Sequence, residues 1–577
     1  MGKYTIRVVT GDSLLAGSCN QVQLWLVGEH WEADLGQKLR PMRRGVSAPS
    51  SKSAPLHLGR LPLVKLRKDE HLGDFDWFCK WISVRGPGTN GEALFPCYCW
   101  VQGSGIVCLP EGTGEGGGAT DDQSLFKTHR EQEIQKRKRM YRWGSWKDGL
   151  ILPVAGRTPW DLPKNERFQE DKDFDFSFSL AKVGGLGPQG DTNPVKRPED
   201  FKRIFPSAKT ALDDALFGYQ FLSAWLVLPP GMEDLKTQLE KELQVLYGVK
   251  LNVIILKQQY VAAPLVMLKL QPDGKLLPMV IQLQPPHHGC PTPMLPSNPP
   301  MAWLLAKTWV RSSDFQMHQL QSHLLRGHLM AEVISVATMR TLPSLHPIYK
   351  GVSTSSGGHV DILQRATACL TYHSLCPLAD LADRQDALRL WGIISRYVEG
   401  MVGLFYMTDE AVRDDPELQA WCREITETGL QGARDRGFPV SLDTRVQLCH
   451  FVTMCIFMCP GQHASAHLGQ LDWYSWIPNG PCTMRKPPPV SKDVTEKDIM
   501  DSLPTAHQAH MQKTFTKFLG RRQPIMVALG QHKERYFSGP RPQAVAAVDQ
   551  EIEARNAGLQ LPYEYLRPSM VENSVTI

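Results

Sequence analysis

Long hydrophobic runs are missing from this sequence. No run of about eighteen apolar residues occurs, so no segment predicts a membrane-spanning helix, and any membrane contact is expected to be peripheral. The first residues, Met1 to Val8, alternate between apolar and polar side chains. This alternation predicts a strand rather than a secretory leader.

Cysteine pairs with the spacing of a metal finger are also missing among the 13 cysteines. Cys97 and Cys99 are too close for the usual CxxC pattern, and Cys455 and Cys459 lie in an apolar, helix-like run. We therefore expect reduced thiols and a cytoplasmic protein that contacts membranes only peripherally. The net charge of +5 is small for 577 residues, so no nucleic-acid partner is expected.

The length of 577 residues exceeds what one hydrophobic core needs, so the chain is expected to contain more than one domain. The first 110 or so residues have the short, punctuated strands of an all-β sandwich. The expected strands are Tyr4–Val9, Val22–Val27, Leu63–Arg67 and Trp81–Val84. Pro41 to Pro55 reads as a basic loop and Gly112 to Asp122 as a linker. Trp77, Phe78 and Trp81 are interpreted as core aromatics, with lipid contact as the alternative.

Helical periodicity dominates the rest of the chain. The expected helices are Phe126–Tyr141, Met232–Leu246, Ala302–Arg311, Phe315–Thr341, Ala387–Phe405, Pro416–Gly429 and Val446–Leu468. A hairpin is expected from Val261–Leu270 and Met279–Leu283, with its turn at 272–274. The predicted domains are a β-sandwich at 1–111 and a mainly α-helical domain at 112–577.

Two histidine pairs lie inside these apolar helices. His463 and His467 are four residues apart, which places them about 40° from each other on one helix face. His323 and His328 are five apart and would diverge by about 140° on a regular helix. A π-type turn, eased by Gly327, would bring them onto one face.

A buried histidine is usually a hydrogen-bonded core residue, and one pair at this spacing is modest evidence for a metal. Two pairs on helices that could face each other favour a metal site, because burying four imidazoles without partners is costly. Nitrogen ligands without a thiolate suit iron, zinc, copper or nickel. The glutamate of an HExxH zinc hydrolase is absent, and so is an obvious general base, so this alternative ranks last.

The sequence resembles the animal lipoxygenases over nearly its whole length, and most resembles the epidermal-type members of the arachidonate 12- and 15-lipoxygenase group. The segments that carry the resemblance are Met1–Tyr4, Val22–Gly28, Trp303–Lys307, Ser322–His328, Trp421–Thr426, Gly461–His467, Gln470–Tyr474 and Val571–Ile577. The resemblance implies an N-terminal PLAT-like sandwich that aids membrane or substrate access, followed by a helical iron domain.

The resemblance also implies one non-haem iron per chain, with a defined set of ligands. These are His323, His328, His463, His467 and the C-terminal carboxylate of Ile577. It implies that Gln470 and Gln319 support the ligands from behind. The family usually has glutamate at the position of Gln319, so this hydrogen-bond network is expected to differ here.

The reaction that the resemblance implies is dioxygenation of polyunsaturated fatty acids, such as arachidonate and linoleate, to hydroperoxides. Dioxygen and the fatty acid are then the substrates, and carbon 12 of arachidonate is the expected position, with carbon 15 next. Matching positions suggest that Phe315, Val352, Phe515 and Leu519 line the substrate pocket. Plain core packing explains each of these four residues equally well from the sequence alone.

Several internal segments of the family pattern are missing. Breaks occur after Leu222, after Lys350, between Arg384 and Gln385, and near Val545. Losing a helix over the active site would cost as much as many core truncations, each worth about 2–5 kcal/mol. The sequence therefore leaves two hypotheses: an active lipoxygenase, favoured by the intact ligand set, and a catalytically impaired, lipid-binding relative, favoured by the breaks.

Overall fold

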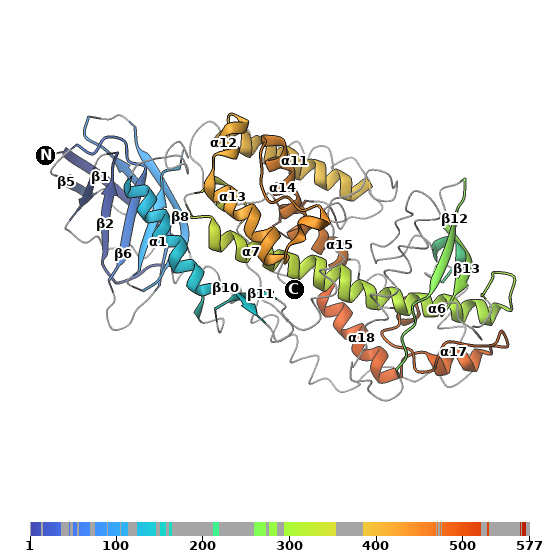
Figure 1. The fold of residues 1–577 in the computed structure, drawn as a ribbon. Helices are drawn as coiled ribbons and strands as arrows, with labels where there is room; N and C mark the ends of the chain where they lie inside the picture. Colours follow the sequence, from blue (N-terminus) through green and yellow to red (C-terminus); the bar gives the residue numbers. More distant parts are fainter. Residues whose placement is uncertain are drawn as a thin grey trace.

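The computed structural model shows a β-sandwich at the N-terminal end and a helical body beside it (Figure 1). It describes residues 2–12, 16–29, 31–35, 45–46, 50–54, 57–69, 76–88, 91–103, 105–112, 124–145, 151–156, 161–163, 212–217, 259–272, 276–284, 293–344, 346–352, 385–468, 470, 474, 476–520, 528–529, 566 and 568–572. The predicted linker at 112–122, apart from its first residue, and the predicted helix Met232–Leu246 lie outside these residues.

The sandwich consists of two antiparallel sheets. One sheet has the order β3-β2-β6-β9, and the other has the order β4-β1-β7-β8 with β5 also paired to β1. The strands are β1 (Gly2–Thr10), β2 (Val22–Val27), β3 (Glu32–Asp34), β4 (Gly45–Val46), β5 (Ser50–Ala54), β6 (Leu63–Lys68), β7 (Trp77–Arg85), β8 (Ala93–Val101) and β9 (Ile106–Pro110). Alternate side chains of β1, namely Tyr4, Ile6 and Val8, are buried in the core between the sheets. The predicted sandwich is confirmed.

The expectation of a loop from Pro41 to Pro55 is wrong. Within this stretch β4 and β5 form, and β5 pairs antiparallel to β1 from Gly2 opposite Ala54 to Ile6 opposite Ser50. Serine-rich sequence has little β propensity of its own, so the composition suggested a loop. The pairing uses backbone groups that β1 would otherwise expose along one edge, and these bonds do not depend on side-chain type.

The aromatic cluster of the sandwich divides between core and surface. Trp77 is fully buried, and its Nε1 donates to Thr10 Oγ1 at 2.9 Å. Phe78 and Trp81 are half-buried, and Phe78 packs edge-to-face on Trp100 with ring centroids 5.3 Å apart. The interpretation as core aromatics is therefore correct for Trp77.

Helix α1 (Ser124–Met140) lies beside the sandwich and runs along α7 (Met330–Thr341) of the helical body (Figure 1). Arg130 pairs with Glu417 through two hydrogen bonds. Arg137 donates from Nη1 to the Leu342 carbonyl at 3.0 Å and from Nη2 to the Tyr349 hydroxyl at 2.9 Å. The basic face of α1 is thus bonded to the helical body.

The helical body contains the long helices that the sequence predicted, apart from Met232–Leu246, which lies outside the described residues. Its further elements are β10 (Tyr141–Ser145), β11 (Ile151–Ala155), α4 (Asp214–Phe217), β12 (Leu265–Leu270), β13 (Leu276–Gln282), α6 (Pro300–Met317), η4 (His318–Leu329), α8 (Pro347–Val352), α11 (Gln385–Phe405), α12 (Asp409–Arg413), α13 (Pro416–Arg423), η6 (Glu424–Gly429), η7 (Ala433–Arg436), α14 (Arg445–Ile456), η8 (Phe457–Gln462), α15 (His463–His467), η9 (Ile477–Asn479), α17 (Glu496–Ser502) and α18 (Ala506–Leu519). The predicted hairpin is confirmed as β12 and β13.

The core of this body forms where α7, α11, α13 and α14 meet. Trp421 is fully buried there, packs edge-to-face on Phe451 at 5.1 Å between ring centroids, and donates from Nε1 to Thr338 Oγ1 at 3.0 Å. Burying large side chains of this kind contributes about 1.5–3 kcal/mol each. Among the helices that the structure describes, none is long and apolar enough to cross a bilayer.

Candidate metal centre

Two long helices, each interrupted by π-helical winding, carry the predicted histidines. α6, η4 and α7 form one continuous helix, because the residues at both junctions, His318 and Leu329, have right-handed helical backbone. η4 is a π-helix of 12 residues that includes His323 and His328. The predicted π-type turn is therefore confirmed. It places residues five apart one above the other, as the two imidazoles require.

The second helix runs through α14, η8 and α15. It begins at a capping box, in which Thr444 accepts from the Gln447 N–H and Gln447 bonds back to Thr444. Pro460, which has no N–H to donate, lies inside the π-wound η8 and precedes His463 by three residues. η4 packs against both η8 and α15, so the two π segments bring their histidines face to face.

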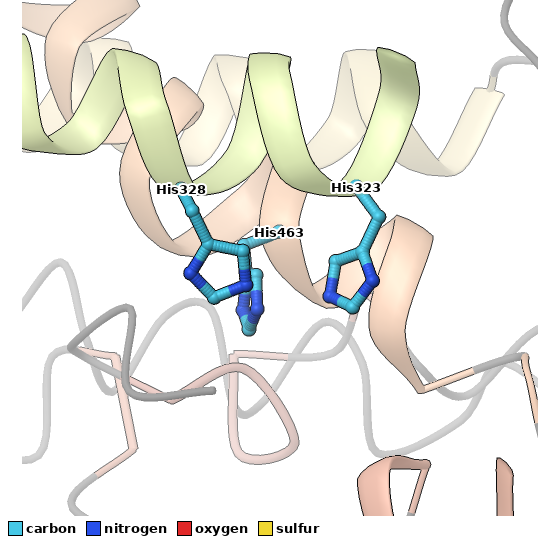
Figure 2. Close-up of side chains that lie close together, drawn as sticks. All are labelled: His323, His328 and His463. Atoms are coloured by element: carbon cyan, nitrogen blue, oxygen red, sulfur yellow. The ribbon is translucent and has the colours of Figure 1, made fainter. Parts of the chain in front are cut away.

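Three imidazoles converge at this crossing (Figure 2). One ring nitrogen from each of His323, His328 and His463 lies within 4.8 Å of the other two. The ring centroids of His323 lie 5.1 Å from His328 and 5.3 Å from His463. Gly327 lies against His463, where a Cβ would meet His463 Cδ2 at 3.4 Å, an ordinary van der Waals contact. The three side chains come from two helices and point to one position.

His467 lies beside this group rather than within it. Its Nδ1 is 3.4 Å from His323 Nε2, and its ring stacks on His463 with centroids 4.9 Å apart. The structure therefore brings the four predicted histidines together, three of them around one point.

Burial keeps the imidazoles of His323, His328 and His467 neutral. It lowers the pKa of His328 to about 4 and, together with the nearby His328 and His318, lowers the pKa of His467 to about 3. Burial also holds the pKa of His323 well below its ordinary value. A neutral imidazole has a free lone pair, which is the form that binds a metal.

Two glutamines lie behind the histidines. Gln319 Nε2 donates to Gln470 Oε1 at 2.6 Å, and Gln470 Nε2 donates to the His467 carbonyl at 3.3 Å. Gln319 Oε1 is 3.5 Å from His323 Nδ1, a long contact. The pair links the two π-interrupted helices and reaches the ring of one histidine and the backbone of another.

Tyr474 is a residue that the sequence reasoning missed as part of this region. It is fully buried, and its ring lies edge-to-face on Phe315 at 4.6 Å and on His318 at 5.5 Å between centroids. Burial and the nearby Asp314 carboxylate raise its pKa. The sequence could have indicated that Tyr474 lies near the histidines, because it follows Gln470 by four residues in the same motif. Phe315, predicted to line a pocket, is thus in the same buried region as His318.

Of the other predicted site residues, Phe515 is exposed, and the side chains of Val352, Leu519 and Ile577 are not described. Phe515 lies on α18 and is 39% exposed, so it is half open to solvent. Val352 ends α8 and Leu519 ends α18, but the structure describes neither side chain. Ile577 lies outside the described residues. The pocket assignments therefore stay predictions.

The donor set fits a transition metal. The group holds imidazole nitrogens alone, which suits iron, zinc, copper or nickel rather than calcium or magnesium. Without an ion, neutral imidazoles buried against one another would leave ring nitrogens with poor partners, which is unfavourable in a protein interior.

A second buried cluster joins His346, Asp415 and Glu417. His346 Nε2 lies 3.1 Å from Asp415 Oδ2, which also accepts from the Tyr406 hydroxyl at 2.7 Å, while Glu417 pairs with Arg130. Since each carboxylate already has donors, we interpret this cluster as structural.

Comparison with known proteins agrees with this geometry. The lipoxygenase family model matches residues 247–370 and 377–557, and the PLAT/LH2 domain model matches residues 4–109. The chain belongs to the lipoxygenase family, whose members are dioxygenases, and its function is that of a lipoxygenase.

The similar curated proteins belong to one group within the lipoxygenase family. The chain is 64% identical over 665 positions to the rat polyunsaturated fatty acid (12S)/(13S)-lipoxygenase, epidermal-type, and 62% identical to the mouse protein of the same name, with 100% of each chain covered. It is 57% identical to the human polyunsaturated fatty acid lipoxygenase ALOX15, again with full coverage. The resemblance to the epidermal-type, 12/15-lipoxygenase group is confirmed.

Solved structures share the fold. A calcium-dependent 11R-lipoxygenase matches with a TM-score of 0.80 at 26% identity, and coral 8R-lipoxygenase matches with 0.81 at 24%. Both comparisons cover 100% of each chain.

The alignment length agrees with the expectation that positions are missing from the chain, while the predicted places of the breaks stay predictions. The alignment with the rat relative spans 665 positions and this chain has 577 residues, so 88 positions have no residue here. The predicted breaks after Leu222 and near Val545 lie outside the described residues, the break after Lys350 falls within α8, and that before Gln385 falls at the start of α11. Despite them, the relatives support lipoxygenase function rather than the impaired alternative.

Proposed function

We propose that this chain binds one non-haem iron and dioxygenates polyunsaturated fatty acids that carry a cis,cis-1,4-pentadiene. The observation that carries the proposal is the convergence of His323, His328 and His463 from two π-interrupted helices. In this proposal His467 and the carboxylate of Ile577 complete the ligand set. The substrate class follows the names of the rat, mouse and human relatives.

The chain's own residues have three tasks in this function. Neutral imidazoles hold the ion, which when bound supplies the oxidant for hydrogen removal at the bisallylic carbon. Gln319 and Gln470 hold the helices in register behind the ligands, at 2.6 Å from each other. Burial of His323, His463 and His467 keeps bulk water from the site.

The experiment measures bound iron and conjugated-diene absorbance with arachidonate. We expect about one iron per chain and diene formation in the wild-type chain. His328→Ala should lose the iron and lower turnover by at least about 100-fold, because it removes a ligand rather than a supporting group. His507→Ala, on the exposed side of α18, should change neither quantity.

A His328→Ala chain that kept its iron and its rate would contradict the proposal. Iron without diene formation in the wild-type chain would support the metal site and contradict the reaction. Zinc bound in place of iron after growth with both metals would favour the hydrolase alternative.

The position of oxygenation is proposed as carbon 12 of arachidonate, with carbon 15 as the second candidate. The support is the (12S)/(13S) designation of the rat and mouse relatives. Phe315 is the proposed pocket residue best supported by packing, since it lies against Tyr474 beside His318. Chromatography of the hydroperoxide products distinguishes the two positions.

We also propose a cytoplasmic location with peripheral membrane contact through the sandwich. No disulfide joins the described cysteines, as suits a reducing compartment. Trp31 and Ile106 of the sandwich are 60% and 54% exposed, which suits contact with a lipid interface. Sedimentation with phospholipid vesicles measures this contact.

A further inference from the structure

Three thiols lie close together in the sandwich, more than 200 residues before the histidines in sequence. Cys79 of β7 lies directly opposite Cys99 of β8, and Cys97 precedes Cys99 by two residues. Cys79 and Cys97 are buried, and Cys99 is partly exposed. None of the three forms a disulfide, and none takes part in the proposed iron site.

The backbone is distorted at this point. Cys79 pairs with Cys99, and Trp81 pairs with Pro96. The two pairs are separated by two residues along β7 but by three residues along β8. The additional residue forms a β-bulge, and within it Tyr98 has a φ of 45°. The left-handed region is unfavourable for a tyrosine, and such strain is concentrated at functional sites.

The bulge brings two sulfurs close together. In a regular strand, Cα atoms two residues apart are separated by about 6.6 Å, near the upper end of the range of about 4.4–6.8 Å that a disulfide spans. Tyr98, whose backbone is left-handed, lies between the two cysteines. The Sγ atoms of Cys97 and Cys99 are 3.1 Å apart, about 1 Å more than a disulfide bond of about 2.05 Å.

We propose that Cys97 and Cys99 form a dithiol oxidation site that reduces a hydroperoxide to an alcohol and closes to a disulfide. Cys99 reacts first, since it is the exposed member: its sulfur attacks the peroxide, an S–O bond forms, and the O–O bond breaks to release the alcohol. The sulfur of Cys97 then attacks Cys99, an S–S bond forms, and the oxygen leaves as water with the remaining thiol proton. Two thiols thus supply the two electrons that reduce one O–O bond.

The site reacts slowly at neutral pH. The hydrogen bond with Cys79 and burial raise the pKa of Cys97, and the hydrogen bond with Cys97 and burial raise that of Cys99. The reactive thiolate is therefore scarce, and proximity rather than acidity favours the second step. Because the thiolate fraction grows tenfold per pH unit below the pKa, the rate should rise about tenfold from pH 7 to pH 8.

The oxidant class coincides with the product class of the proposed reaction, so the enzyme would generate the compound that oxidises it. This connection rests on the proposed function. The dithiol site itself does not, because an added hydroperoxide tests it without turnover.

Tryptic peptides separate the possible partners. Trypsin cleaves after Lys80 and Arg85, so Cys79 lies on the peptide ending at Lys80, while Cys97 and Cys99 share the peptide that begins at Gly86. Cys108 lies on that peptide too, so Cys108→Ser provides the clean background. After treatment with hydrogen peroxide or a fatty-acid hydroperoxide, we expect this peptide to lose two hydrogen atoms, and dithiothreitol to restore them.

Two variants test the assignment of each sulfur. In Cys97→Ser, Cys99 should stop at the sulfenic acid, which dimedone traps, while Cys99→Ser should not react at this peptide. A cross-link between the Cys79 peptide and the Cys97 peptide would overturn the assignment. The proposal would also be overturned if both cysteines stayed reduced after days of peroxide treatment at pH 8. In that case the thiols of Cys97 and Cys99 would both still be alkylated once the chain is unfolded.

Discussion

Deleting a single residue, Ile577, tests whether the C-terminal carboxylate is a ligand of the proposed metal site. If the carboxylate of Ile577 is a ligand, deleting Ile577 moves the terminus by one residue, about 3.3 Å of extended chain, and removes the carboxylate from the ion. We expect bound iron per chain to fall at least tenfold, measured by metal analysis of the purified protein.

The control for this deletion is Ile577→Val, which keeps the terminal carboxylate and most of the apolar side chain. It should retain iron close to the wild-type level. Equal iron in the deletion and in this control would remove the C-terminus from the ligand set and leave the imidazoles as the whole of it.

The spacing of the histidines alone predicted the π winding of the helix that carries His323 and His328. The five residues between His323 and His328 do not fit an α-helix, and the π-helix η4 is the winding that fits them. The contacts of Tyr474 with Phe315 and His318 could not be predicted this way, since they join segments more than 150 residues apart in sequence whose meeting depends on tertiary packing. The same limit applies to the ring contacts between His463 and His328.

At the scale of elements, Asp415 connects the start of α13 to two buried side chains. Its Oδ1 accepts from the N–H groups of Glu417 and Leu418, and its Oδ2 contacts His346 and Tyr406. Burial alone would raise the pKa of Asp415, but the hydrogen bonds from His346, Leu418 and Tyr406 together lower it. The carboxylate is therefore the form that stabilises the fold.

The sign of the pH dependence follows from that lowered pKa. Stability from Asp415 is present above the ordinary carboxyl pKa of about 3.9 and is lost as the pH falls through the lower value of the folded protein. Asp415→Asn should lower stability by about 1–2 kcal/mol at pH 7, and this difference should shrink below pH 4. Urea unfolding at both pH values measures it.

The neighbouring exposed Asp414 provides the control, since Asp414→Asn should change the unfolding midpoint little at either pH. A difference between wild type and Asp415→Asn that stayed constant down to pH 3 would show that the charge of Asp415 contributes nothing.

Helices and strands were predicted correctly where a side-chain pattern marks them. The prediction failed for β5, which forms through backbone hydrogen bonds to a neighbouring strand. α11 and α14 have apolar faces that bury residues such as Leu390 and Leu448, and their helices were expected. β5 has the sequence of a loop, Ser50 to Ala54, and becomes a strand because β1 offers it unpaired backbone groups. No side-chain pattern within β5 could show that a partner edge exists.

At the scale of the whole molecule, α1 bonds to the helical body through Arg130 and Glu417, whose side chains are 6% and 16% exposed. Arg130→Ala should destabilise the protein by about 3 kcal/mol, because it leaves a mostly buried carboxylate without its partner. The thermal unfolding midpoint measures this effect.

A double-mutant cycle separates the pair from its surroundings. Arg130→Ala combined with Glu417→Gln should recover much of the loss, since the orphaned charge is gone. Lys138→Ala, on the exposed side of the same helix, should leave the midpoint unchanged. Strict additivity of the two substitutions would show that the ion pair does not couple α1 to the helical body.

The winding of η4 determines the rotational phase between α6 and α7. A π turn bonds residue i to i+5 instead of i+4, so it accommodates more residues per turn while the helix axis continues. If this segment were α-wound with the same five-residue spacing, His323 and His328 would diverge by about 140° and face apart. The shared face of His323 and His328 therefore depends on how the backbone is wound, and a change from π to α winding would separate the two imidazoles without interrupting the helix that carries them.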